Sequence, residues 1–125
     1  MRPKEACKTF SSASVERVIL DITNKMKDKD LARFLYGVAI LMCIFSYSLS
    51  RLFENTFPNT LDTTIKWYND DLTFVVTGDI DAEWLRDSSN QFRVYLPLVS
   101  IDEELRNLTR GVINLQGGLV TCLSS

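Results

Sequence analysis

The sequence predicts a mainly α-helical chain with one short extended segment. Two observations indicate this fold class. Apolar residues recur at helical spacing in three stretches, and serine or aspartate residues that can cap a helix stand close to the start of each. Only one run, residues 73–77, is β-branched and aromatic as strands are. A chain of 125 residues suffices for one domain with a modest core.

The first predicted helix covers about residues 15–28. Its apolar side chains recur at i, i+3, i+4, i+7 and i+11, at Val15, Val18, Ile19, Ile22 and Met26. Ser14 can cap the N-terminus, and lysines gather near the other end, where the helix dipole favours cations. Asp30 can cap a second helix that begins at Leu31.

An uncharged run of 17 residues, 34–50, lies between Arg33 and Arg51. This length is at the lower limit for crossing a bilayer, and the end of the run is rich in serine. The run lies too far into the chain for a simple cleaved signal peptide. A membrane anchor and a buried helix both stay open as interpretations.

The helical pattern ends after this run. Pro58 disfavours helical geometry at Phe57, and this ends the helical region. Residues 69–71 (Asn-Asp-Asp) are typical of a turn. Residues 73–77 are predicted as a short strand, which Gly78 ends.

A further helix is predicted over about residues 82–95. Asp79 or Asp81 can cap it. Its apolar side is formed by Trp84, Leu85, Ser88, Phe92, Tyr95 and Leu96.

The last predicted helix opens with a capping box. Ser100 is the capping residue and Glu103 its partner three residues later. The inner face is formed by Ile101, Leu105, Leu108, Val112 and Leu115. The pair Gly117-Gly118 is predicted to stop the helix.

The charge is small overall but unevenly distributed. The formal net charge is −2, from 14 basic and 16 acidic side chains, so no basic field indicates a nucleic-acid partner. Residues 1–33 carry a net charge of +3 and residues 51–125 carry −5, and seven carboxylates lie within residues 62–87. An acidic stretch with aromatic side chains suits a neutral polyol such as a sugar better than a phosphate. A solvated loop region would explain many of these charges as well.

The residue types indicate no metal site and no cofactor. Histidine, the commonest zinc ligand, is absent. Cys7, Cys43 and Cys122 lie far apart without a Cys-x-x-Cys pair, so neither a disulfide framework nor a structural zinc site is predicted. The pair Asp79 and Asp81 is of a kind that holds a metal in some nucleotide-sugar transferases, but two aspartates alone make a poor site.

The compartment does not follow from the sequence. Asn107-Leu108-Thr109 matches an N-glycosylation sequon, and chance explains such a match as well as use does. Secretory, extracellular and membrane-anchored locations all stay open.

The densest cluster of candidate chemistry is residues 77–88. It combines a Gly-permitted bend, a predicted helix start, the Trp84 ring and the pair Arg86 and Asp87. Proteins hold sugars in this way, with carboxylate and guanidinium contacts to vicinal hydroxyls and an aromatic ring against the apolar sugar face. The competing interpretation is structural: Arg86 and Asp87 form salt bridges and Trp84 belongs to the core.

Three motifs in this region occur in a recognisable order. They are residues 57–64 (Phe-Pro-Asn-Thr-Leu-Asp-Thr-Thr), residues 74–80 (Phe-Val-Val-Thr-Gly-Asp-Ile) and residues 84–88 (Trp-Leu-Arg-Asp-Ser) followed by Gln91. With them the sequence resembles glycoside hydrolase family 125, the metal-independent exo-α-1,6-mannosidases. The resemblance covers roughly residues 2–33 and 52–116.

The resemblance implies an (α/α)6 barrel of the six-hairpin glycosidase type, of which residues 1–125 are one partial, N-terminal domain. It implies an inverting hydrolase that releases terminal mannose from α-1,6-linked mannosides, mannan or N-glycan-type oligosaccharides. Carried over, Arg86 and Asp87 bind mannose hydroxyls, Trp84 shapes the pocket, and Asp79 supports or contacts it. The implied acid and base are two glutamates well downstream with no counterpart here. No catalytic residue is therefore assigned, and the 125-residue chain alone is expected to be inactive.

Two departures from the family pattern affect the domain organisation. Removing residues 34–51 joins Arg33 directly to Leu52 and restores the continuous sequence pattern of the family. This indicates that residues 34–51 are an insertion, such as a retained intron. The tail from about Gly117, residues 117–125, is interpreted as aberrant in the same way. The alternative is a short non-catalytic protein, anchored in a membrane through residues 34–50, that binds mannosides, or a helical interaction module.

Overall fold

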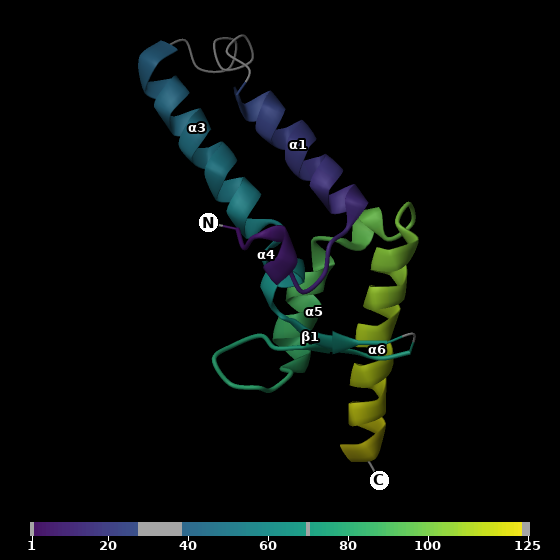
Figure 1. The fold of residues 1–125 in the computed structure, drawn as a ribbon. Helices are drawn as coiled ribbons and strands as arrows, with labels where there is room; N and C mark the ends of the chain where they lie inside the picture. The colour runs from purple at the N-terminus through teal and green to yellow at the C-terminus, as the bar shows by residue number, and fades with distance from the viewer. Residues whose placement is uncertain (1, 28–38, 70, 124–125) are drawn as a thin grey trace.

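A computed structural model describes residues 2–27, 39–69 and 71–123. The mainly helical fold class is confirmed, with one two-stranded antiparallel sheet. Helices α1 (Ala13–Lys27) and α3 (Ala39–Thr56) lie side by side and run in opposite directions (Figure 1). The strands β1 (Ile65–Tyr68) and β2 (Thr73–Val75) cross helix α6 (Glu103–Leu123), with α5 (Leu85–Arg93) nearby (Figure 1).

Helix α1 forms as predicted, but its cap is a different serine. The Ser12 hydroxyl accepts a hydrogen bond from the Val15 amide at 3.3 Å, so Ser12 rather than Ser14 caps the helix. Ser14 lies inside the first turn, where its hydroxyl donates to the Asp102 carboxylate at 2.7 Å. A short 3-10 turn, η1 (Glu5–Cys7), precedes the helix. The predicted cap at Asp30 lies outside the described residues.

Helix α3 ends at Thr56, just before the Phe57-Pro58 pair that was predicted to stop it. The helical region nevertheless continues with α4 (Asn59–Thr63), because proline is tolerated immediately before a new helix. Within residues 2–27, 39–69 and 71–123, no helix has the length and apolar character that a membrane span requires.

The strand predicted at residues 73–77 is observed as β2 but ends earlier, at Val75, and its partner β1 was not predicted. Ile65 is buried while the other residues of β1 are exposed, so the strand lacks the alternation that would reveal it. The register pairs Ile65 with Val75 and Tyr68 with Thr73, with a bulge after Ile65. The predicted turn is confirmed: the Asn69 side chain accepts hydrogen bonds from the amides of residues 71 and 72 at 2.9 and 2.7 Å.

The helix predicted over 82–95 is observed as α5, and neither Asp79 nor Asp81 caps it. Trp84 stands at the capping position and makes no side-chain cap. Ser88, Phe92 and Tyr95 are buried, whereas Trp84, Leu85 and Leu96 of the predicted apolar side are exposed. The helix therefore buries a narrower stripe than the sequence pattern suggested. A 3-10 turn, η2 (Leu96–Leu98), leads from it toward α6.

Helix α6 differs from the prediction at both ends. Asp102, not Ser100, caps its start, because the Asp102 carboxylate accepts from the Leu105 amide at 2.9 Å. Ile101 is exposed rather than internal. Gly117 and Gly118 do not stop the helix, since a glycine inside a helix that is already formed costs only about 1 kcal/mol.

Helix α6 and the hairpin approach each other closely at Gly111. A Cβ atom at this position would lie 2.9 Å from backbone atoms of Leu72 and Thr73 and closer still to the Thr73 hydroxyl. The core lies around this contact and beneath α1. Its buried apolar residues are Phe10, Val15, Ile19, Leu61, Ile65, Val75, Phe92, Tyr95, Leu105, Leu108 and Val112. Glycine at 111 therefore lets α6 pack directly on the backbone of β2.

Candidate functional site

The four predicted site residues lie in one segment, the loop after β2 and the first turn of α5. Asp79 belongs to the exposed loop between β2 and α5, which projects at the lower left of Figure 1. Trp84 immediately precedes α5, and Arg86 and Asp87 lie in its first turn. The structure therefore groups Trp84, Arg86 and Asp87, while no hydrogen bond or ion pair among the described residues joins Asp79 to them.

The side chains of this group are open to solvent. Trp84 is 55% exposed, and the side chains of Arg86 and Asp87 are 86% and 45% exposed. Arg86 Nε donates to Asp87 Oδ1 at 3.3 Å, and such an exposed pair adds little to stability. Trp84 is not part of the core, so the purely structural interpretation of this residue is wrong. The group combines an open aromatic face with a guanidinium and a carboxylate.

A partly buried network of hydrogen bonds supports this exposed group. Gln116 of α6 donates to Ser88 Oγ at 2.7 Å and to Glu83 Oε1 at 3.0 Å. Ser88 is fully buried, and its hydroxyl also donates to the Trp84 carbonyl at 2.8 Å. The second oxygen of Glu83 accepts from the Val75 amide of β2 at 3.3 Å. Gln116 thus joins the start of α5 to α6 and, through Glu83, to the strand.

This network was not predicted from the sequence. Glu83 counted only as one of several acidic residues, and Gln116 carried no signal of a role at the site. The two residues are 33 positions apart, so only the folded chain brings them together. A separate ion pair joins Lys66 of β1 to Asp81 of the loop at 3.0 Å.

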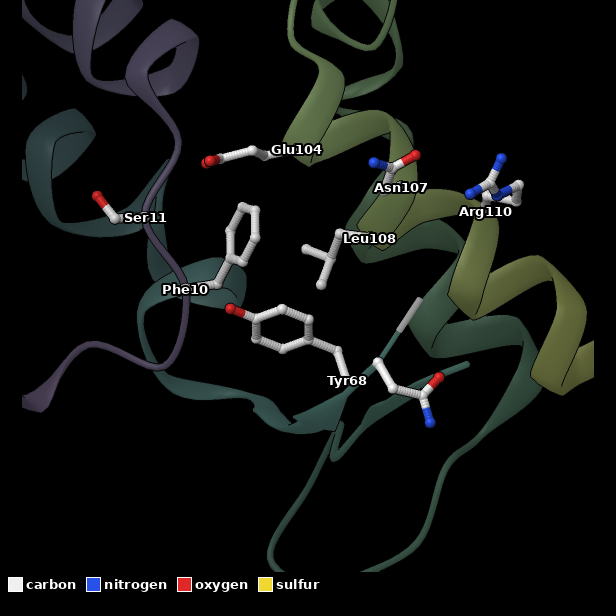
Figure 2. Close-up of a pocket in the computed structure, with 8 residues that line it drawn as sticks. Phe10, Ser11, Tyr68, Glu104, Asn107, Leu108 and Arg110 are labelled. Carbon is white, nitrogen blue, oxygen red and sulfur yellow. The ribbon is translucent and has the colours of Figure 1, made fainter. Parts of the chain in front are cut away.

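Two hollows of the described structure lie away from the four predicted residues. The larger, of about 510 Å³, lies between the hairpin turn and α6, beside the chain segment at Phe10 (Figure 2). The smaller, of about 270 Å³, lies between α3 and α5 and includes Gln91. Gln91 Oε1 is buried without a hydrogen-bond partner in the part of the chain that the structure describes. Neither of these two hollows includes Asp79, Trp84, Arg86 or Asp87.

No group of three or more cysteine or acidic residues within the described ranges is arranged to hold a metal ion. Asp79 and Asp81 therefore form no metal site with a third residue of those types there.

Strong ionic interactions lie instead where the N-terminal segment meets α1 and α4. Arg2 donates to Asp62 at 2.7 Å and to Glu16 at 2.6 Å, and the Asp62 side chain is only 2% exposed. The hydrogen bond from Arg2 lowers the pKa of Glu16 to about 2. Its bonds to Glu16 and Asp62 in turn raise the pKa of Arg2. These groups fasten the chain terminus to the core.

Two further side chains with shifted pKa values, Asp102 and Tyr95, lie within the packed part of the fold. Burial alone would raise the pKa of Asp102, but hydrogen bonds from Ser12, the Leu105 amide and Ser14 lower it to about 2. Burial raises the pKa of Tyr95 to about 12. Both side chains join elements of the core and stand apart from the exposed group at the start of α5.

Comparison with known proteins places this chain in a family. The model of the metal-independent alpha-mannosidase family (GH125) matches residues 46–123. The chain is also 44% identical over 123 residues to the meiotically up-regulated gene 157 protein of Schizosaccharomyces pombe. That similarity covers 95% of this chain and 21% of the yeast protein, so the chain spans about a fifth of the length of this relative. The family match covers more than half of the chain and includes the whole segment from Asp79 to Asp87. The chain therefore belongs to the metal-independent α-mannosidase family, GH125.

Proposed function

We propose that this chain is the N-terminal portion of an inverting exo-α-1,6-mannosidase and supplies part of the pocket for the terminal mannose. The observation that carries the proposal is the exposed group Trp84, Arg86 and Asp87, held from beneath by the Gln116 network. Family membership supports a mannoside as the ligand. The α-1,6 linkage of the mannoside and the inverting mechanism are proposed from the resemblance to the family.

Each side chain of the group has a role that its chemistry supports. The Trp84 ring offers an apolar surface to one face of the sugar, and Arg86 can donate two hydrogen bonds to neighbouring hydroxyls. Asp87 lies in the first turn of α5, where the helix dipole favours its charged, hydrogen-bond-accepting form. Asp79 would approach the sugar from the loop, which has no regular structure between β2 and α5.

The catalytic acid and base are proposed to lie outside this chain. The family implies two glutamates beyond these residues, and the chain spans about a fifth of its yeast relative. Apolar side chains stand exposed on α5, on α6 and before α6, among them Leu85, Ile101, Ile113 and Val120. We assign these surfaces to contacts with the remaining helices of an (α/α)6 barrel, since soluble proteins rarely leave large apolar areas uncovered.

The test compares binding with hydrolysis in the 125-residue chain. Saturation-transfer NMR is expected to detect weak binding of α-1,6-mannobiose, while assays for released mannose stay at the buffer level. Arg86→Ala should weaken binding roughly tenfold or more, because a hydrogen bond to a charged group contributes about 1.5–3 kcal/mol. Arg93→Ala, at an exposed position later on α5, is the matched control.

A second matched pair uses the two tryptophans. Trp84→Ala should also weaken binding, whereas Trp67→Ala should not, although Trp67 is similarly exposed on β1. Equal binding by wild type, Arg86→Ala and Trp84→Ala would contradict the assignment of the pocket. Mannose release by the 125-residue chain above the buffer level would contradict the placement of the catalytic pair.

We further propose that residues 34–51 are an insertion, such as a retained intron. In the last turns of α3, Tyr47 and Leu49 are exposed together with Ser48, while Ser50 is fully buried. The Ser50 hydroxyl has no hydrogen-bond partner among the described residues. A helix that has evolved to pack against α1 would bury its apolar side chains and expose its serines. The burial of Ser50 beside the exposed Tyr47 and Leu49 does not follow this pattern. A transcript that joins Arg33 to Leu52 would support the proposal, and native protein containing a 34–51 peptide would contradict it.

A further inference from the structure

The sequon Asn107-Leu108-Thr109 lies at the larger hollow, which is separate from the candidate sugar pocket. Figure 2 shows Asn107 on α6 between Glu104 and Arg110, at the rim of the hollow. Asn107 is exposed, and no hydrogen bond or ion pair with the described residues occupies its amide. Leu108, the next residue, points into the core. The amide is therefore free to carry a substituent without disturbing the packing of α6.

The hollow has room and suitable walls for a sugar beside Asn107. Its volume is about 510 Å³, and its floor includes the rings of Phe10 and Tyr68, which meet edge to face at 5.6 Å. Tyr68 is about half exposed, so part of its ring is open to the hollow. Glu104 and Arg110 add an acceptor and a donor on either side. This surface can accept the apolar face and the polar edge of a hexosamine.

We propose that Asn107 is an N-glycosylation site whose first sugar rests in this hollow. In the transfer, the Asn107 side-chain nitrogen bonds to the anomeric carbon of a polyprenyl-diphosphate-linked oligosaccharide. The bond from that carbon to the diphosphate oxygen breaks, and the polyprenyl diphosphate leaves with the electron pair. The amide nitrogen gives up one proton to a basic group of the transferase and stays in an uncharged amide. The modification places this face of α6 on the lumenal or extracellular side of a membrane.

The burial of Thr109 sets the order of events. The transferase must reach the sequon hydroxyl, but in the folded chain Thr109 is 6% exposed and donates to the Leu105 carbonyl at 2.7 Å. The glycan is therefore attached before α6 packs against the hairpin. The hydroxyl makes only this bond, within its own helix, so its removal breaks no hydrogen bond between elements.

The test uses the protein purified from the cells that produce it. It is treated with peptide N-glycosidase in H2 18O and then digested at glutamates, which releases a peptide that begins at Leu105. The proposal predicts an 18O-labelled aspartate at position 107. Asn114, in the same peptide, lacks a hydroxyl residue two positions later and reports spontaneous deamidation, so it must stay unlabelled. An unlabelled Asn107 beside labelled peptides of other glycoproteins in the same extract would overturn the proposal.

Variants expressed in the same cells separate the modification from misfolding. Asn107→Gln and Thr109→Ala are each expected to abolish the glycosidase-sensitive shift in gel mobility, whereas Thr109→Ser keeps the sequon and the shift. Asn114→Gln should behave as wild type. A Thr109→Ala protein that kept its label at Asn107 would also overturn the proposal, because the transfer would then not depend on the sequon.

Discussion

Replacing Gly111 by alanine should destabilise the chain although alanine is the better helix former. The new methyl group would lie 2.9 Å from backbone atoms of Leu72 and Thr73, and backbone cannot move aside as a flexible side chain can. Overpacking of this kind costs about 1–3 kcal/mol, and the close backbone contacts place Gly111→Ala near the upper value. The gain in helix propensity offsets about 1 kcal/mol. The expected net loss of unfolding free energy is about 2 kcal/mol.

The same helix provides controls of opposite sign. A methyl group added at Gly117 or Gly118 would have nothing within 4 Å, so Gly117→Ala and Gly118→Ala should each stabilise the chain by up to about 1 kcal/mol. Urea unfolding followed by circular dichroism measures all three variants. With a denaturant slope of about 2 kcal/mol/M, Gly111→Ala should lower the midpoint by about 1 M. A Gly111→Ala midpoint at or above that of wild type would refute the argument from close packing.

The remaining predictions concern ionisable groups. Because folding lowers the pKa of Asp102 to about 2, its stabilisation is present above the unfolded pKa near 3.9 and is lost as the pH falls through 2. As the pH is lowered from 5 to 2, the urea midpoint of the wild type should decrease, and that of Asp102→Asn should decrease less. An equal decrease in both proteins would contradict this prediction. Because the pKa of Tyr95 is raised to about 12, stability should decline as the pH rises from 10 toward 12, and Tyr95→Phe should lose that decline while costing about 1 kcal/mol at neutral pH. Arg2→Ala leaves the Asp62 carboxylate buried without its cation and should cost about 3 kcal/mol, whereas Arg17→Ala, at an exposed position, should change the unfolding free energy by under about 0.5 kcal/mol.

The helices were predictable because their inward faces repeat at 3.6 residues, whereas the residues that cap α1 and α6 were not. Ser14 and Ser100 satisfy the local rules for a cap, yet Ser12 and Asp102 are the residues used. The choice depends on a contact between the starts of α1 and α6, which local sequence rules do not contain. Strand β1 was missed for a related reason, since its exposed residues carry no alternation and its pairing with β2 is tertiary.

The residues of the candidate site could be proposed from the sequence, but the hydrogen-bond network that holds them could not. The motif around Trp84 belongs to the resemblance by which the family was identified, and the structure places Trp84, Arg86 and Asp87 at one helix start. Their role in binding a sugar stays a prediction. The role of Gln116 depends on hydrogen bonds that span 28 and 33 residues. Asp79 lies in the loop before α5, and its contact with the sugar stays a prediction.

Asp102 makes the start of the first long helix dependent on the last one. Its carboxylate accepts from the Ser14 amide and hydroxyl while it caps α6, and 88 residues of chain separate the two ends of these bonds. A ribosome that has released α1 has not yet produced its electrostatic partner. Until then the positive end of α1 has only the Ser12 hydroxyl as a local cap, so its first turn should fray. The hydrogen bonds of Asp102 at the two helix starts can therefore form only after Asp102 and the first turn of α6 have both been synthesised.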